Sequence, residues 1–306
     1  MPGRPPSGDN RGMDNTPDSP YQTLRLQVAE GVARVTLDHG PINLLDKAMF
    51  KELLRLVDQL AADEQVRVVV IGSAHPGYFI AHFDVNLILR FPAGPPAPVD
   101  PDAPLSNFHR LCEALRTMPK ATIAVIEGRA GGGGSEIALS CDMRFALRDK
   151  AVFNQPEVAL GILPGGSGTV RLSRLMGRSR TLEAVLGCDD IPADVAEAWG
   201  WVNRALPAAE LWPHVNRLVA RIASFPPRAV AAAKASVLQA EQGVLAHLHA
   251  EGAGFQGLLA DPAARDAMQR FLAEGGQTPE GEARLGDLAA ALHRPGAHAP
   301  LTSKGH

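Results

Sequence analysis

The stretch from Thr122 to Glu157 decides the fold, and its three informative parts are Thr-Ile-Ala-Val-Ile at 122–126, Gly-Gly-Gly-Gly-Ser-Glu at 131–136 and Phe-Asn-Gln-Pro-Glu at 153–157. The β-branched run Ile123 to Ile126 is typical of a buried strand. Four consecutive glycines contribute no side-chain packing, so we expect the strand to end before them. The residues from Ser135 to Leu139 then predict the first turn of a helix.

A glycine loop that opens a helix exposes free backbone N–H groups. Such an N-terminus binds a phosphate, a carboxylate or a developing oxyanion equally well. Two carboxylates nearby, Glu136 and Glu157, favour the last of these, because acids beside an oxyanion site are suited to proton transfer next to a carbonyl. The alternative is that Glu136 only stabilises its helix N-terminus and Glu157 is an exposed loop acid.

The motifs that follow are specific when taken in order: Gly-Gly-Gly-Ser-Glu at 132–136, Cys-Asp at 141–142, Gln-Pro-Glu at 155–157, Gly-Ile-Leu-Pro-Gly-Gly-Ser-Gly-Thr at 161–169 and Arg-Leu at 171–172. From about Thr23 to Phe271 the sequence resembles the crotonase superfamily of enoyl-CoA hydratases and isomerases. This resemblance implies an α/β fold, a spiral of repeated ββα units with a C-terminal helical module. We expect a disordered tail at 1–20, the core at 21–207, a helical trimerisation module at 208–295 and a frayed tail at 296–306.

The resemblance also implies an activity, the addition of water across the 2,3 double bond of a trans-2-enoyl-CoA. By position, Glu136 activates the water and Glu157 donates a proton to the α carbon. The N–H groups of Phe83 and Gly133 form the oxyanion hole, and the N–H of Gly165 helps to hold the water. Phe83 stands where relatives commonly have Ala, so we expect a narrower acyl pocket.

His82 stands where Gly is common in the family, and two interpretations are open. It is either a general base or a side chain that packs and forms hydrogen bonds. Relatives often carry a basic residue shortly after the position of Asp84 to meet the CoA phosphates, whereas this chain has Val-Asn-Leu at 85–87. Lys120 and Lys234 are the candidates to take its place.

Composition argues against other classes. The 306 residues include 30 Lys and Arg against 33 Asp and Glu, with no basic run, which disfavours nucleic acid and anionic membranes as partners. The scattered cysteines Cys112, Cys141 and Cys188 indicate neither a disulfide framework nor a zinc site, so we expect reduced thiols in a cytoplasmic protein. No metal, flavin or nicotinamide motif is found, and we expect no cofactor beyond the CoA carried by the substrate.

Two groups of alternatives remain. An isomerase or a hydrolase would share the fold and the CoA site, and a non-catalytic or RNA-binding protein would share only the scaffold. The helical module implies a homotrimer or a dimer of trimers by resemblance. Helical spacing in this module predicts an apolar face that a single core does not cover, made of Leu211, Val215, Leu218, Val219 and Ile222.

Elsewhere, alternation predicts a hairpin over 23–28 and 32–37, and Asp46 is the expected N-cap of a helix that buries Met49, Leu53 and Val57. The apolar run 66–71 predicts a strand buried on both faces. A loop at 91–104 and a helix over 105–118 follow. Four further helices are expected at 211–223, 227–239, 243–259 and 264–273, and one more near 282–293.

Overall fold

The computed structural model describes residues 20–92, 100, 102–241 and 243–292. Apart from Pro20, the N-terminal tail expected at 1–20 lies outside the described residues. The tail expected at 296–306 and most of the loop at 91–104 lie outside them too.

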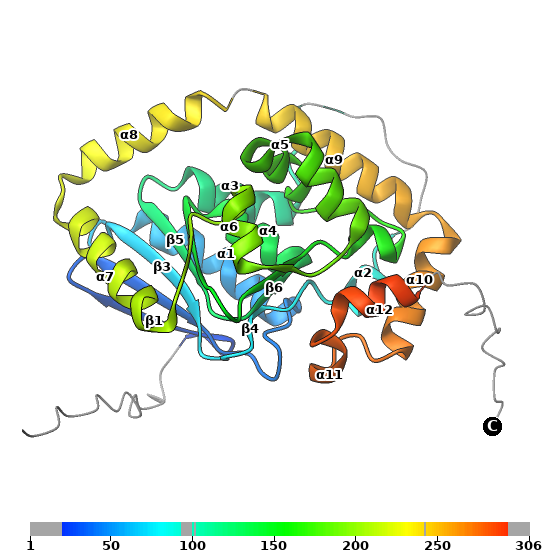
Figure 1. Ribbon diagram of the computed structural model, residues 1–306. Helices are drawn as coiled ribbons and strands as arrows, with labels where there is room; N and C mark the ends of the chain where they lie inside the picture. Colours follow the sequence, from blue (N-terminus) through cyan, green and yellow to red (C-terminus); the bar gives the residue numbers. More distant parts are fainter. Residues whose placement is uncertain (1–19, 93–99, 101, 242, 293–306) are drawn as a thin grey trace, which may run out of the picture.

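Two β-sheets form the centre of the molecule (Figure 1). The first has six strands in the order β1 (Leu24–Ala29), β2 (Val32–Leu37), β3 (Val68–Ser73), β5 (Ala121–Ile126), β7 (Met143–Leu147) and β10 (Arg204–Leu206). The second has four, in the order β4 (Tyr78–Ile80), β6 (Arg129–Gly131), β8 (Val152–Asn154) and β9 (Ile191–Pro192). All neighbouring strands are parallel except the β1–β2 hairpin and the β8–β9 pair. Successive pairs β3–β4, β5–β6 and β7–β8 give one strand to each sheet, which confirms the spiral fold.

The large sheet is buried on both faces, as the apolar runs predict. Side chains alternate along a strand, so Val69 and Ile71 of β3 face the main core while Val68 and Val70 face a second apolar cluster. The strands read as continuous apolar sequence because helices cover both sides of this sheet.

Helices join and cover the strands of the core. They are α1 (Lys47–Ala62), α2 (Val85–Ile88), α3 (Asn107–Thr117), α4 (Gly132–Ser140), the 3₁₀ turn η1 (Glu157–Leu160), α5 (Gly168–Gly187) and α6 (Ala193–Trp199). Asp46 caps α1 as predicted, since its side chain accepts from the N–H groups of Ala48 and Met49. Helix α5 is kinked at Gly177, where the backbone has a positive φ of 75°.

The glycine stretch differs from its expected course. Gly131 belongs to β6, and α4 begins at Gly132, three residues earlier than predicted. Another backbone approaches this early turn closely, since a Cβ on Gly134 would lie 2.3 Å from the carbonyl oxygen of Ile80. Glycine is needed inside this first helical turn because β4 passes against it.

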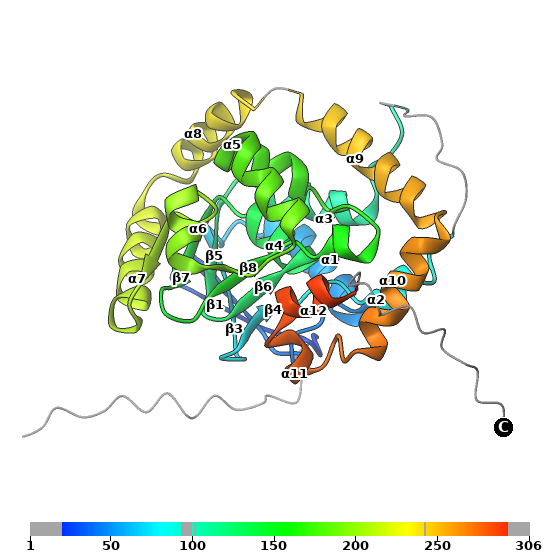
Figure 2. The same ribbon diagram turned by 45° about the vertical axis from the view of Figure 1, so that its right-hand side comes forward.

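The C-terminal part of the described chain is helical. Its helices are α7 (Ala208–Ser224), α8 (Pro227–Gln239), α9 (Val244–Leu259), α10 (Pro262–Ala273), α11 (Pro279–Glu282) and α12 (Leu285–Ala291). Figures 1 and 2 show α7 to α10 as an arc around the outside of the core. The single helix expected near 282–293 is two short ones, α11 and α12. No helix in the described ranges is long and apolar enough to cross a membrane.

The apolar face of α7 corrects one expectation. Leu211, Val215 and Val219 are buried within this chain against the outer face of the large sheet, and Leu218 and Ile222 pack on the same cluster. They therefore do not need a neighbouring subunit to cover them. Large exposed apolar side chains lie instead at the end of α5 and along the arc from α7 to α9: Leu182, Leu186, Phe225, Val237 and Leu245.

Candidate active site

One cavity of about 850 Å³ brings all the predicted site residues together. Its lining includes Phe83, Gly133, Glu136, Glu157 and Gly165, from four separate segments of the chain. The core forms one side of this cavity, and α9 of the helical module forms another through residues that include Phe255.

The backbone around Phe83 leaves its N–H group available. In the bridge between Leu45 and Phe83, the N–H of Leu45 donates to the His82 carbonyl at 3.0 Å and the N–H of Asp84 donates to the Leu45 carbonyl at 3.1 Å. Both bonds avoid the N–H of Phe83, which has no hydrogen-bond partner among the residues that the structure describes.

Gly133 lies beside Phe83, in the first turn of α4, where N–H groups have no carbonyl one turn earlier to bind. A Cβ added to Gly133 would lie 3.2 Å from the Cβ of Phe83. The two residues are therefore close enough for their N–H groups to serve one carbonyl oxygen.

Aromatic side chains form the wall beside these two residues. The ring of Phe83 packs against Phe50, Phe91 and Phe108 with centroid distances of 5.8, 6.3 and 5.6 Å, and all four residues line the cavity. The Phe83 side chain thus takes up room in the cavity, as expected of a bulkier residue at this position.

Glu136 is buried in the second turn of α4, where the glycine loop at 164–168 holds it. One oxygen, Oε1, accepts from the N–H groups of Gly166 at 2.8 Å and Gly168 at 2.7 Å. Burial, followed by the charges of Glu157 and Glu251, raises the pKa of Glu136 well above its usual range. The two N–H donors oppose that shift because they favour the ionised carboxylate.

Glu157 is the first residue of η1, and its side chain is buried. In the orientation that satisfies its amide, Gln155 donates to both carboxylate oxygens of Glu157, at 3.0 and 3.3 Å. Burial raises the pKa of Glu157 to about 8, although the nearby His82 acts in the opposite direction. Burial therefore favours the protonated form of both carboxyl groups, and the two N–H donors at Glu136 favour its ionised form. The structure does not support the alternative of an exposed loop acid.

Gly165 lies in the cavity lining, where the absence of a side chain leaves room for Phe255. A Cβ at this position would lie 2.9 Å from the Phe255 ring. The neighbouring N–H groups of Gly166 and Gly168 are those that hold Glu136, and the role of the Gly165 N–H stays a prediction.

His82 uses both ring nitrogens inside the protein. Nδ1–H donates to the carbonyl of Phe83 at 2.8 Å, and Nε2 lies 2.9 Å from Oε1 of the buried Glu282. Burial alone lowers the pKa of His82, but the Glu282 carboxylate and both hydrogen bonds outweigh it and raise the pKa. Both ring nitrogens of His82 are therefore engaged within the protein, which supports the packed, hydrogen-bonded interpretation over the general base.

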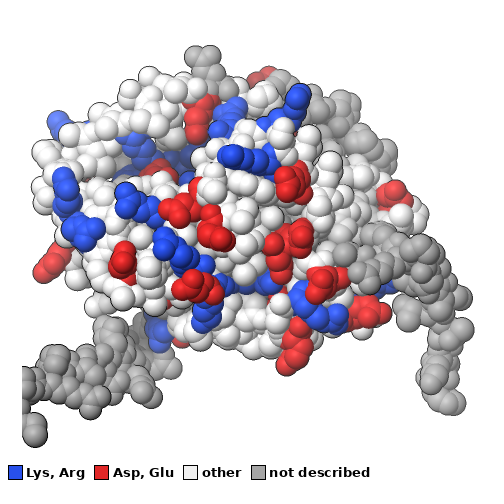
Figure 3. Space-filling view, in the orientation of Figure 1, with Lys and Arg blue, Asp and Glu red and all other residues white. Residues whose placement is uncertain are grey.

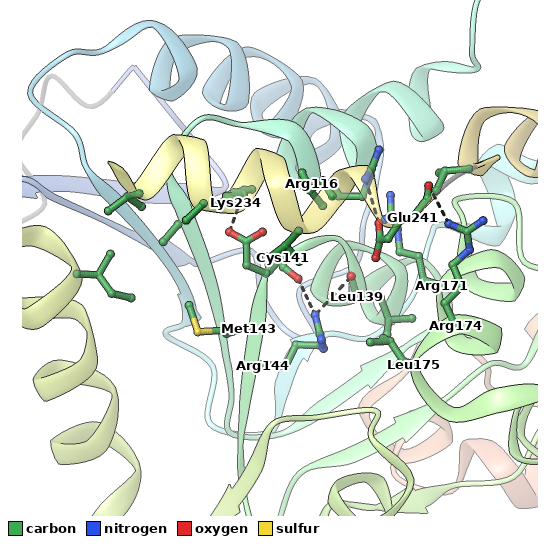
Figure 4. Close-up of a pocket in the computed structure, with 18 of the residues that line it drawn as sticks. Arg116, Leu139, Cys141, Met143, Arg144, Arg171, Arg174, Leu175, Lys234 and Glu241 are labelled. Atoms are coloured by element: carbon green, nitrogen blue, oxygen red, sulfur yellow. Dashed lines mark hydrogen bonds and ion pairs between the residues drawn. The ribbon is translucent and has the colours of Figure 1, made fainter. Parts of the chain in front are cut away.

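The expected phosphate-binding lysines lie elsewhere. The ammonium of Lys120 donates to the carbonyls of Leu60 and Asp63. Lys234 pairs with Asp142 at 2.8 Å, in a second cavity of about 440 Å³ beneath α8 (Figure 4). The cationic side chains that line the cavity of the two glutamates are Lys47 and Arg90 instead, and both are exposed.

The second cavity is rich in arginine, but protein groups already meet its charges. Arg116 pairs with Glu241 at 3.0 Å, and the guanidinium of Arg144 donates to the carbonyl of Cys141 at 2.6 Å (Figure 4). The thiol of Cys141 is buried there, and burial raises its pKa to about 12. The paired carboxylates and free N–H groups thus mark the larger cavity as the candidate site.

The sequence analysis missed three polar residues of the helical module that hydrogen-bond to loops beside the site: Glu251, Gln277 and Glu282. A signal existed for one of them. Glu251 lies on the face of α9 that also buries Val244 and Leu248, so its carboxylate interrupts an otherwise apolar stripe. An acid in such a position requires buried partners.

Comparison with known proteins agrees with this geometry. The model of the enoyl-CoA hydratase/isomerase family matches residues 27–278. The chain belongs to this family. A probable mitochondrial enoyl-CoA hydratase 2 of Arabidopsis thaliana is 33% identical over 81% of this chain and 81% of its own. The short-chain-enoyl-CoA hydratase of Clostridium acetobutylicum is 31% identical over 79% of this chain and 91% of its own.

Solved structures share the fold of this family member. A crystal structure from Streptomyces avermitilis has a TM-score of 0.81 and 36% identity, covering 90% of this chain and all of its own. An enoyl-CoA hydratase from Mycobacterium avium subsp. paratuberculosis K-10 has a TM-score of 0.72 and 28% identity, covering 83% of this chain and 97% of its own.

Proposed function

We propose that this protein adds water across the 2,3 double bond of a trans-2-enoyl-CoA thioester. The thioester carbonyl accepts from the N–H groups of Phe83 and Gly133. Glu136 takes a proton from water as the water oxygen bonds to the β carbon, and Glu157 gives its proton to the α carbon. Charge accumulates on the carbonyl oxygen meanwhile, and one fixed N–H donor is worth about 3 kcal/mol of barrier in such a step.

One observation carries this proposal: two buried glutamates in unequal surroundings share a cavity. Burial raises the pKa of both, but Glu136 accepts two backbone N–H bonds that favour its ionised form, so we assign Glu136 as the base and Glu157, with its pKa raised to about 8, as the acid. Water addition needs one group of each kind. These groups supply every proton in the reaction, so we propose that no metal, flavin or nicotinamide takes part.

Lys47 and Arg90 are the proposed contacts for the phosphates of CoA, because both are exposed cations on the cavity lining. Replacing both by Ala should raise KM for a CoA thioester several-fold and weaken its salt dependence. The matching N-acetylcysteamine thioester lacks the phosphates and serves as the control. An equal rise in KM for that substrate would show that the two cations act in some other way.

The decisive assay is a panel of crotonyl-, longer-chain and aromatic enoyl-CoA substrates mixed with the enzyme without additives. The aromatic substrate is included because Phe83, Phe50 and Phe108 line the cavity. Loss of the conjugated thioester absorbance reports hydration. If every substrate stays unchanged at high enzyme concentration, the hydratase proposal is wrong.

An isomerase or hydrolase of the same family is the second candidate. A 3-enoyl-CoA and a saturated acyl-CoA separate these activities from hydration. Binding of RNA is not favoured, since Lys and Arg alternate with Asp and Glu on the face shown in Figure 3.

We propose further that the protein assembles as a trimer or a dimer of trimers. The support is the exposed apolar side chains at the end of α5 and on the helical arc, with Leu186 62%, Val237 69% and Leu245 56% exposed. Sedimentation at micromolar concentration tests this, and a stable monomer would contradict it.

A further inference from the structure

The glycine loop that binds Glu136 also binds a second carboxylate, that of Glu251, on its other side. Its N–H groups alternate in direction: those of Gly166 and Gly168 donate to Glu136, and those of Ser167 and Thr169 donate to Glu251 at 2.5 and 3.0 Å. The hydroxyl of Thr169 donates to Glu251 as well. The loop therefore lies between two buried carboxylates, one from the core and one from α9.

The backbone of this loop explains why it needs support on both sides. Ser167 has a φ of 100°, in the left-handed region that residues other than glycine rarely adopt. Such a backbone conformation persists where contacts with the surrounding residues stabilise it. Glu251 supplies that hold through the N–H groups on either side of Gly168.

Glu251 has no other evident reason to be buried. It is 6% exposed on a helix face that is otherwise apolar, and apart from the loop its hydrogen-bond partner in the described part of the chain is Nε2 of the buried His109 at 3.1 Å. Taking a carboxylate out of water is costly unless donors compensate it. Here the donors are His109 and the glycine loop, so the carboxylate and the loop fix each other.

We propose that Glu251 is a positioning residue for hydration, which fixes the glycine loop so that Gly166 and Gly168 aim the Glu136 carboxylate at the water. This inference rests on the proposed function and adds a contribution from the helical module to it. The helical module then completes the site, because the core alone supplies only one side of the loop's hydrogen bonds.

The charge of Glu251 gives the proposal a readout that simple packing would not move. This charge raises the pKa of both Glu136 and Glu157. Other titratable or charged groups packed around these carboxylates are His82 near Glu157, His109 and Cys112 on α3, and Arg171 on α5. None of these four is altered in the variants below.

Three variants test the proposal: Glu251→Gln, Glu251→Asp and the control Glu274→Gln, an exposed glutamate at the end of α10. Removing an outer partner of a reacting group commonly costs 10- to 100-fold in activity. We expect Glu251→Gln to lower kcat about 10-fold with little change in KM, and to move the alkaline limb of the pH profile to lower pH. Glu251→Asp keeps the charge but not the reach, so it should lower kcat without moving that limb. Glu274→Gln should match the wild type.

Amide hydrogen exchange of the segment 164–170 provides a measurement that does not depend on the reaction. Glu251→Gln should speed exchange at Ser167 and Thr169 while the flanking core strands stay protected. If wild-type protein hydrates no enoyl-CoA but this difference appears, the proposed function is wrong, while the role of Glu251 in fixing the loop is supported. Wild-type kcat, pH profile and loop exchange in Glu251→Gln would overturn the proposal. Misfolding of that variant would leave the Glu251→Asp result to decide.

Discussion

The core and the C-terminal helices each contribute buried glutamates to one site, and the two kinds differ. Burial raises the pKa of Glu157 in the core to about 8, and it also raises the pKa of Glu136. Glu282 of α11 is buried as deeply, but its ion pair with His82 outweighs burial and lowers its pKa. A buried acid without a cationic partner is ready to exchange protons, whereas a paired one holds structure.

Glu282 holds the loop that carries Phe83, part of the proposed oxyanion hole. It binds the ring of His82, whose other nitrogen donates to the carbonyl of Phe83. From the same segment, Gln277 accepts from the N–H of Val85 at 2.8 Å and donates to Asp84 at 3.0 Å. The core therefore supplies the proposed reacting groups, and the helical module fixes two loops beside them, at 82–85 and 167–169.

The largest expected effect separates the two kinds of glutamate by rate. Glu136→Gln and Glu157→Gln should each lower kcat by about 10² to 10⁴-fold with little change in KM, because Gln keeps the size but transfers no proton. Steady-state hydration of the best enoyl-CoA measures this. Glu280→Gln, an exposed glutamate on α11, is the control and should behave as the wild type. Near-native rates in both core variants would make these residues structural and remove the contrast.

A smaller effect concerns pH. Glu157 must be protonated to act as the acid, so kcat/KM should fall as pH rises through about 8 and approach a tenfold loss per unit above it. A profile of kcat/KM from pH 5 to 10 shows the limb, and circular dichroism over that range confirms that the protein stays folded. A flat profile to pH 10 would mean that Glu157 does not supply the proton.

The smallest effect is on stability, and its sign should differ between the two regions. The folded protein keeps the Glu157 proton between the ordinary pKa of 4.5 and about 8, so this group makes the fold less stable as pH rises over that window. Glu157→Gln should thus raise Tm by several degrees at pH 8 and by less at pH 5.

Glu282 should show the opposite sign. Its lowered pKa means that it stabilises the fold above its unfolded pKa and loses this contribution as pH falls through the folded one. Glu282→Gln removes the carboxylate that pairs with the buried His82, so Tm should fall by several degrees at pH 7. Differential scanning calorimetry of both variants, with Glu280→Gln alongside, checks the pair of signs. If Tm falls in both the Glu157→Gln and the Glu282→Gln variants, the proposed distinction between reacting and structural carboxylates is wrong.

Much of the core was predictable because its signals are local. The run at 122–126 and the alternation at 32–37 predict strands, and the order of glycines and acids from Gly132 to Gly168 indicates the candidate site through the family resemblance. The helical module was predicted as helices, but its contacts were not. Glu251 lies 84 residues from Ser167, and Glu282 lies 200 residues from His82. Such pairs form only when α9 and α11 fold back on the core, so no local pattern reports them.

The same limit explains the error over α7. Its apolar face was visible in the sequence, but helical spacing does not say which surface covers that face. The large sheet covers Leu211, Val215 and Val219 because β3, β5 and β7 present a second apolar side. Conversely, His82 gave no sequence signal to choose between base and ion pair, since the choice depends on Glu282.

The central claim is that Glu136 and Glu157 act on one water in one proton-transfer step, and the double variant tests it most directly. Turnover of the best enoyl-CoA should be measured for the wild type, Glu136→Gln, Glu157→Gln and the double variant under one set of conditions. Groups that act as a unit are non-additive, so the double variant should be nearly as active as either single variant. If its loss equals the product of the two single losses, the glutamates act independently and the shared step is contradicted.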